Sequence, residues 1–302
     1  MNKKPPLNLQ ENRDIWQVLN ATFTFLGVTF KSLYIDIILI SGPFYILAGI
    51  FSSLSTYNTI FRALDSFGAT SALSTYRFFT PAYWVYLLCL LIGWSLSTCI
   101  IANHVLLYKE YGPGYNKQLA RDAIKKDLFR VIMGNFLNIL VIIAATILFI
   151  IPGIYLAVAN SLLTVIIILD KKMDMVDAFA ESRRLIRDNW WKAVMLGIVA
   201  TMITYVIEMI FTLPSSILSG VILFHSVQGN SMESYSTLFI VLNAIASLGL
   251  TLVAPFSIVC SCIYYYSLKE QKDHVSLMQS IDNIGVQVAK TETETKDDEG
   301  DF

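Results

Sequence analysis

Five polar side chains that could carry out chemistry lie inside long apolar stretches of the sequence. They are Asp36, His104, Asn160, Glu208 and Asn243. A polar group in hydrocarbon must find a partner or water, and in membrane proteins such groups mark ion paths, proton relays and contacts between helices. If these residues converge on a wetted cavity, they form a path for a small solute or a lipid.

The same residues also have a purely structural interpretation. Asp36 lies about one turn inside an apolar stretch and His104 lies near the end of another, where both can be paired or hydrated at a membrane interface. Glu208 can extend toward the interface, and the two asparagines can form hydrogen bonds between helices. The sequence leaves both interpretations open.

No catalytic or metal-binding motif accompanies these residues. The sequence contains no G-x-S-x-G, no H-E-x-x-H and no Gly-rich phosphate loop followed by Lys and Ser or Thr. The three histidines are scattered, and the cysteines Cys89, Cys99, Cys260 and Cys262 lie inside apolar runs rather than in a disulfide framework. We therefore expect no enzyme activity, no cofactor and no metal, with an intramembrane lipid enzyme left open.

The elements that must position these side chains are membrane-spanning helices. Of the 302 residues, 55% are hydrophobic and only 15% are charged, whereas soluble domains carry ~25% charged residues. The apolar residues come in blocks of about twenty, the length of helix that crosses a hydrocarbon core of ~30 Å. The net charge of −1 gives no reason to expect a nucleic-acid partner. The composition predicts an all-α, polytopic transmembrane bundle.

Six spans are expected in this bundle, near 33–54, 83–108, 136–151, 153–169, 190–213 and 238–268. The third and fourth belong to one apolar stretch that is too long for a single crossing at ~1.5 Å per residue. Ile151-Pro152-Gly153 lies near its middle, where Pro removes a helix hydrogen bond and Gly permits a reversal. We therefore expect a helical hairpin that turns at Pro152-Gly153.

The distribution of basic residues predicts the orientation of the bundle. Of the 22 Lys and Arg residues, 20 lie at the chain ends or in connections that would share one side, and only Arg62 and Arg77 lie in the others. By the positive-inside rule, both termini then lie in the cytoplasm. Residues 1–285 are expected to form one membrane domain, followed by a disordered acidic tail at 286–302.

Three amphipathic segments, near 14–30, 119–134 and 174–189, precede spans. In the third, apolar residues at helical spacing oppose a basic face made of Arg183, Arg184, Arg187 and Lys192. Such a helix lies in the membrane interface, with its cations among the headgroups. We expect these four residues to contact anionic phospholipid, and Phe179, Leu185 and Ile186 to lie at acyl depth. The helices either only anchor this face or form a platform for lipid or a partner protein.

Several short motifs resemble those of a known membrane domain. They are Ile151-Pro152-Gly153-Ile154-Tyr155, Asp170, Ala178-Phe179-x-x-Ser182-x-x-Leu185, Asn189-Trp190-Trp191 and a tail motif at 277–285. They resemble the membrane domain fused to some bacterial glycerophosphodiester phosphodiesterases and its stand-alone, Bacteroidetes-type relatives. The resemblance implies that, in the fused enzymes, catalysis belongs to a separate soluble barrel domain with metal-binding carboxylates. It therefore implies a bacterial inner membrane and a phospholipid context, but no active site.

Three classes of function remain at this point. The amphipathic segments and the lack of catalytic motifs favour a non-catalytic scaffold or assembly factor that binds lipid or a membrane-protein partner. The alternative is a carrier or channel for a small solute or lipid, which requires Asp36, His104 and Glu208 to converge on a wetted cavity. An intramembrane lipid enzyme needs two catalytic groups at one depth, and His104 and Glu208 are expected near opposite faces.

Overall fold

The chain is built from helices. The structure, a computed structural model, describes residues 7–65, 80–227 and 233–274, and these contain no strand. The helices are α1 (Ile15–Ile40), α2 (Gly42–Asp65), α4 (Pro81–Tyr111), α5 (Lys117–Leu148), α6 (Ile150–Ala159), α7 (Leu163–Leu169), α8 (Met175–Arg187), α9 (Trp190–Val227) and α10 (Glu233–Asp273), with a 3-10 turn at Gly112–Gly114. The all-α prediction is confirmed. The acidic tail and the motif at 277–285 lie outside the described residues.

Six helical segments in the described chain are long and apolar enough to cross a membrane. They are Ile15–Ile40, Pro81–Tyr111, Gln118–Leu148, Ile150–Leu169, Trp190–Ile222 and Thr237–Asp273. Large apolar side chains cover their outer surfaces, and Ile147 and Ile151, for example, are 80% and 81% exposed. Such surfaces are matched by lipid rather than by water. The segments indicate a multi-pass membrane protein.

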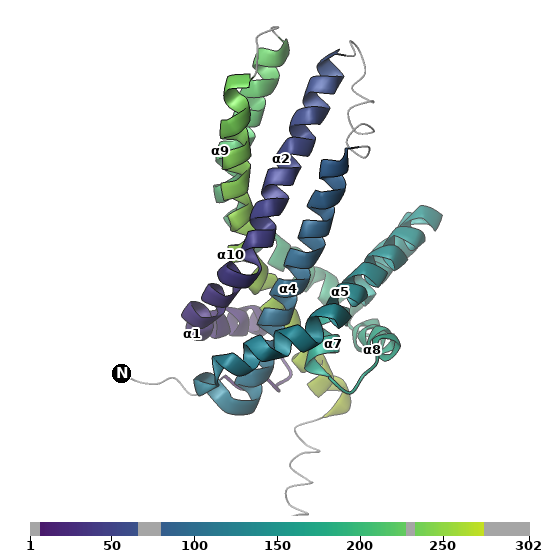
Figure 1. The fold of residues 1–302 in the computed structure, drawn as a ribbon. Helices are drawn as coiled ribbons and strands as arrows, with labels where there is room; N and C mark the ends of the chain where they lie inside the picture. Colours follow the sequence, from purple (N-terminus) through teal and green to yellow (C-terminus); the bar gives the residue numbers. More distant parts are fainter. Residues whose placement is uncertain (1–6, 66–79, 228–232, 275–302) are drawn as a thin grey trace, which may run out of the picture.

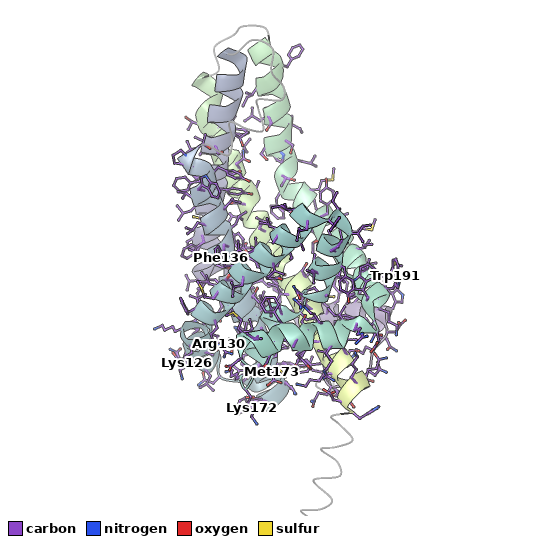
Figure 2. All side chains as sticks on the ribbon, turned by 90° about the vertical axis from the view of Figure 1, so that its right-hand side faces the viewer. Lys126, Arg130, Phe136, Lys172, Met173 and Trp191 are labelled. Carbon is purple, nitrogen blue, oxygen red and sulfur yellow. The ribbon has the colours of Figure 1, made fainter. Side chains whose placement is uncertain are left out.

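Helix α10 is the centre of the packing. It contacts α1, α2, α4, α7, α8 and α9. Figure 1 shows α2, α4, α9 and α10 rising from a broad lower end, where α1, α7 and α8 lie and where the last turns of α10 arrive. Lys126, Arg130 and Lys172 lie at this end (Figure 2), and we call it the basic end.

The main hydrophobic core lies toward the basic end. Fully buried side chains of α1, α4, α7 and α10 form it, among them Phe25, Ile100, Ile166 and Ile263. Side chains of this size, packed closely between helices, hold membrane-spanning segments together through van der Waals contacts. The core therefore fixes the lower parts of the helices, which also carry the buried residues Asp36 and His104.

The first two helices divide at a different position from the one expected. The backbone N–H of Asp14 donates to the Gln17 side chain at 3.0 Å at the start of α1. The helix then continues to Ile40, and the chain bends at Ser41. The expected lead-in at 14–30 is therefore continuous with the beginning of the expected span at 33–54. Residues 28–40 contain neither Gly nor Pro, so no local signal breaks the helix.

Helix α5 likewise joins an expected lead-in to an expected span. Asn116 caps its first turn by accepting a hydrogen bond from the Gln118 N–H at 3.0 Å, and the helix then runs unbroken to Leu148. Gly134 lies at the expected junction. A Cβ there would lie 2.7 Å from Cδ1 of Ile167, so this glycine serves close packing on α7 and not a break.

The hairpin forms, but its reversal lies at Phe149 and not at Pro152-Gly153. Phe149 has an extended backbone (φ −155°, ψ 134°) between α5 and α6. Pro152 lies in the first turn of α6, where a backbone N–H has no helical acceptor to lose. At Gly153, a Cβ would come within 2.9 Å of the Thr146 Cα. The glycine therefore permits close contact between the two arms of the hairpin.

Helix α8 packs its apolar face against the protein. Leu185 and Ile186 are 0% exposed, and the Ser182 hydroxyl donates to the Ala159 carbonyl at 2.8 Å. Phe179 is only partly buried and packs against the same core. Leu185 and Ile186 therefore contact protein and not lipid, because α6, α7 and α10 provide the apolar surface that lipid would have provided. Their expected position at acyl depth stays a prediction.

Candidate functional site

The structure brings two of the five candidate residues into contact. Asp36 of α1 and His104 of α4 are 1% and 0% exposed, with Oδ2 and Nε2 3.2 Å apart. Arg121 of α5 donates from Nε to Oδ1 of Asp36 at 3.0 Å. The Tyr115 hydroxyl is hydrogen-bonded to the other ring nitrogen of His104. One buried carboxylate thus connects three helices.

The partners of Asp36 close the cluster. A buried carboxylate is tolerated only when charge and hydrogen bonds compensate its desolvation. Arg121 supplies the charge, Arg121 and His104 supply the hydrogen bonds, and Tyr115 holds the His104 ring from its other nitrogen. Burial, together with the nearby charge of Asp36, raises the pKa of Tyr115 to about 12. Tyr115 therefore remains a neutral hydroxyl. This arrangement serves as a clamp between helices, and its polar atoms are occupied by one another.

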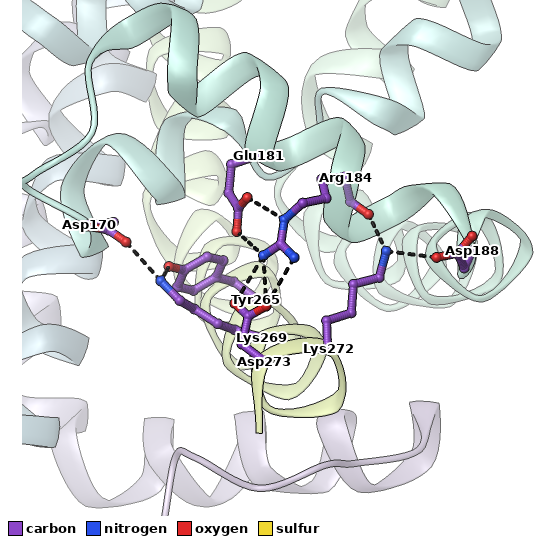
Figure 3. Close-up of polar contacts among 8 residues, drawn as sticks. All are labelled: Asp170, Glu181, Arg184, Asp188, Tyr265, Lys269, Lys272 and Asp273. Atoms are coloured by element: carbon purple, nitrogen blue, oxygen red, sulfur yellow. Dashed lines mark hydrogen bonds and ion pairs between the residues drawn. The ribbon is translucent and has the colours of Figure 1, made fainter. Parts of the chain in front are cut away.

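A second network fastens α8 to the end of α10 (Figure 3). Arg184 pairs with Glu181 at 2.7 Å and with Asp273 at 3.0 Å. Lys272 pairs with Asp188 at 2.9 Å, and Lys269 of the same helix reaches Asp170 at 2.8 Å. The hydrogen bonds to Glu181 and Asp273 raise the pKa of Arg184, and the bond from Lys272 lowers the pKa of Asp188.

The four basic residues expected at lipid headgroups fall into two pairs. The protein engages Arg184 as above, and Arg183 donates from Nε to Oδ1 of Asn160 at 3.2 Å while lying over the Phe179 ring. Arg187 and Lys192 are exposed and form no ion pair within the described parts of the chain. These two remain available to a ligand.

Arg187 and Lys192 belong to a groove between α6 and the junction of α8 with α9. Its volume is about 590 Å³, and its lining residues are Ile151, Ile154, Tyr155, Arg187, Asp188, Asn189, Trp190, Trp191 and Lys192. Tyr155 and Trp190 stack with ring centroids 6.1 Å apart, and Trp191 meets Trp190 edge-on at 4.9 Å. The groove therefore combines two cations with an aromatic and aliphatic wall.

An apolar cavity continues this groove along α6 and α9. Its volume is about 560 Å³, and small or aliphatic residues such as Ala157, Val158, Ala193, Leu196 and Gly197 line it. These residues follow those of the groove by one helical turn on both helices. The two hollows together present a charged and aromatic end followed by an apolar channel between helices.

The remaining candidates do not join these features. The Glu208 carboxylate is partly exposed on α9 and has no hydrogen bond or ion pair in the described chain. The Asn243 amide donates to the Phe239 carbonyl of its own helix at 2.9 Å. Asn160 is 1% exposed and lines a separate polar cavity. The five residues are thus distributed over four places, and only Asp36 and His104 share one.

The buried cysteines and the other potential metal ligands do not come together in a site. All four cysteines are buried and unpaired. Among residues 7–65, 80–227 and 233–274, no three His, Cys, Asp or Glu side chains form a group that could hold a metal ion. The cysteines therefore belong to the packing of α4 and α10.

Comparisons with known proteins identify one similar region. Residues 124–268 match the model of a domain of unknown function, DUF7847. The match includes the groove, the apolar cavity and the motifs at 151–155 and 189–191. Comparison with curated proteins and with solved structures gives no match. The resemblance to the glycerophosphodiester phosphodiesterase membrane domain receives no support from these comparisons.

Proposed function

We propose that the chain is a non-catalytic scaffold or assembly factor of a bacterial inner membrane, and that it binds anionic phospholipid along α6 and α9. The observation that carries this proposal is the groove, in which Arg187 and Lys192 stand unpaired beside three aromatic rings. A lipid bound there would serve to fix the protein, or a partner protein beside it, at this face of the membrane.

The chemistry of the groove fits a phospholipid from headgroup to chain. Cations near a membrane surface attract anionic lipid by about 1 kcal/mol each, and Trp and Tyr favour the headgroup level. The neighbouring apolar cavity has the form and lining to accept an acyl chain. Asp188, the acid in the groove, is neutralised by Lys272, so the net charge at the headgroup end is positive.

The placement of the other polar residues supports a scaffold rather than a carrier. A carrier needs its polar groups along one path. Arg121 and Tyr115 occupy Asp36 and His104, and neither Glu208 nor Asn243 lines the cavity that Asn160 borders.

Replacing Arg187 and Lys192 together by Gln is expected to weaken binding of phosphatidylglycerol about thirtyfold, because two headgroup attractions of about 1 kcal/mol each are lost. Native mass spectrometry of the purified protein, titrated with this lipid in mild detergent, measures the change. The matched control replaces Lys125 and Lys126, which are exposed on α5 and lie outside the groove. Equal binding by the two double variants would contradict the proposal.

The proposed orientation places the basic end and both termini in the cytoplasm. We expect a cysteine replacing Pro81, at the start of α4, to react with a membrane-impermeant maleimide on intact cells. A cysteine replacing Lys171, at the basic end, should react only after permeabilisation. The native cysteines are buried, so their background labelling should be low. Labelling of the Lys171 position on intact cells would invert the topology.

A further inference from the structure

A polar cavity lies between α4, α5, α7 and α10, apart from the groove. Its volume is about 150 Å³, and it is lined by side chains that include Thr98, Asn135, Asn138, Asn160, Thr164 and Ser257. All of these helices belong to segments apolar enough to span a membrane. The hydroxyls of Thr98 and Ser261 donate to carbonyls of their own helices. The amide oxygen of Asn138 and the amide nitrogen of Asn160 are buried without a partner in the described residues, which is costly in such surroundings and calls for a ligand.

The lining of the cavity selects against charged ligands. Most of its side chains carry hydroxyl or amide groups, and none is an acid, a base or a histidine. An ion placed there would be desolvated without a counter-charge, which costs several kcal/mol. A neutral group that hydrogen-bonds meets no such penalty. The cavity is therefore suited to an uncharged polar ligand.

Asn160 is held so that it offers a donor. A guanidinium only donates hydrogen bonds, so the bond from Nε of Arg183 requires the amide oxygen of Asn160 to face α8. The amide nitrogen is buried and has no partner in the described residues. Arg183 thus fixes the orientation of the amide and leaves its N–H groups for the cavity.

Helix α5, on the other side of the cavity, offers hydrogen-bond acceptors. The amide oxygen of Asn138 is buried and has no partner in the described part of the chain. The amide nitrogen of Asn135 donates to the Ser95 hydroxyl at 2.9 Å, which leaves the oxygen of Asn135 as an acceptor. Donor and acceptor groups therefore approach the same space from opposite sides, as a hydroxyl requires.

The volume of the cavity and its opening to the surface further restrict which ligands can bind. At ~30 Å³ per molecule in the liquid, the volume equals that of about five waters. Trp94 is 41% exposed and Ser161 is exposed at the edge of the cavity. Ser161, Ser257 and Ser261 line both this cavity and the apolar one. A polar head in this cavity and its chain in the apolar cavity would thus be adjacent, and that chain would exclude the acyl chain of the groove phospholipid from the apolar cavity.

We propose that this cavity binds an uncharged group bearing hydroxyls, either the head of a neutral lipid such as diacylglycerol or a small free polyol. The inference goes beyond the proposed phospholipid groove, because neither Arg187 nor Lys192 lines this cavity. The shared chemistry is a neutral head that both donates to Asn138 or Asn135 and accepts from Asn160.

The test uses the full chain in phosphatidylcholine nanodiscs with a photoactivatable diacylglycerol whose reactive group lies beside the glycerol. We expect cross-links at residues 94–98, 135–138, 160–165 and 257–261, located by mass spectrometry. Asn138→Leu removes one hydrogen bond and should lower their yield roughly five- to tenfold. Asn160→Leu should have the same effect but also releases Arg183, so Asn138→Leu is the cleaner variant.

Three comparisons decide the outcome. Asn243→Leu, whose amide bonds only to its own helix, should leave the yield unchanged, as should the double replacement of Arg187 and Lys192. Loss of the cross-links in excess free glycerol would support the free polyol as source, and their persistence the lipid. Cross-links elsewhere, or equal yields from wild type, Asn138→Leu and Asn160→Leu, would overturn the proposal, whatever the groove variants show.

Discussion

Arg121→Met is expected to lower the free energy of unfolding by about 3 kcal/mol, because it leaves the buried carboxylate of Asp36 without its cationic partner. Removing the charge as well, in Asp36→Asn/Arg121→Met, should recover part of this loss. The general reason is that an unpaired buried charge costs more than the absence of the pair. Unfolding in mixed micelles with increasing SDS measures all three proteins.

A matched control separates this effect from a general loss of positive charge. Lys125 lies one turn further along α5, is exposed and has no ion pair in the described chain, so Lys125→Met should change stability by less than ~0.5 kcal/mol. If the double variant were no more stable than Arg121→Met, the cluster would not act as a charge-compensated clamp.

Gly49→Ala is expected to destabilise the protein by about 1–3 kcal/mol through overpacking. An added Cβ would lie 2.8 Å from the backbone oxygen of Asn243 and 2.9 Å from the Cβ of Ser247. These atoms belong to α10, and a backbone oxygen cannot move aside as the end of a flexible side chain does. Helices α2 and α10 would have to separate.

The same replacement of glycine by alanine is expected to stabilise the protein at Gly27. A Cβ at Gly27 of α1 would meet nothing within 4 Å, so alanine should stabilise the helix by about 0.5–1 kcal/mol. Thermal unfolding in detergent should move in opposite directions for the two variants. A rise in thermal stability for both variants would show that the α2–α10 contact is looser than described, and a fall for both would show that Gly27 is not as free of neighbours as described.

The sequence was sufficient for the class of protein and for the apolar segments, because composition and block length are physical requirements of a bilayer. The sequence was less informative about helix ends. Asp14 and Asn116 precede the first residues of α1 and α5, but no residue indicated whether a helix would end between an amphipathic segment and the span that follows it. Pro152 suggested a reversal that lies three residues earlier, since proline is compatible with a first helical turn.

The site was harder to predict than the fold. Asp36, His104 and Asn160 could be selected singly as polar residues in apolar stretches. Their partners Arg121 and Arg183 are far from them in sequence and looked like ordinary interfacial cations. An amphipathic pattern is the same whether protein or lipid covers its apolar face, so Leu185 and Ile186 could not reveal which one does.

The two ionic clusters should respond differently to salt. Arg184, Asp273 and Asp188 have side chains 46%, 30% and 74% exposed, and at physiological ionic strength charges in water are screened over ~8 Å. Asp36 and His104 are almost without solvent contact, so ions reach them far less. Rising ionic strength should therefore weaken the ion pairs between α8 and the end of α10, while the contact between Asp36 of α1 and His104 of α4 is screened far less. The same fold thus contains one attachment that depends strongly on the electrolyte and one that depends on it far less.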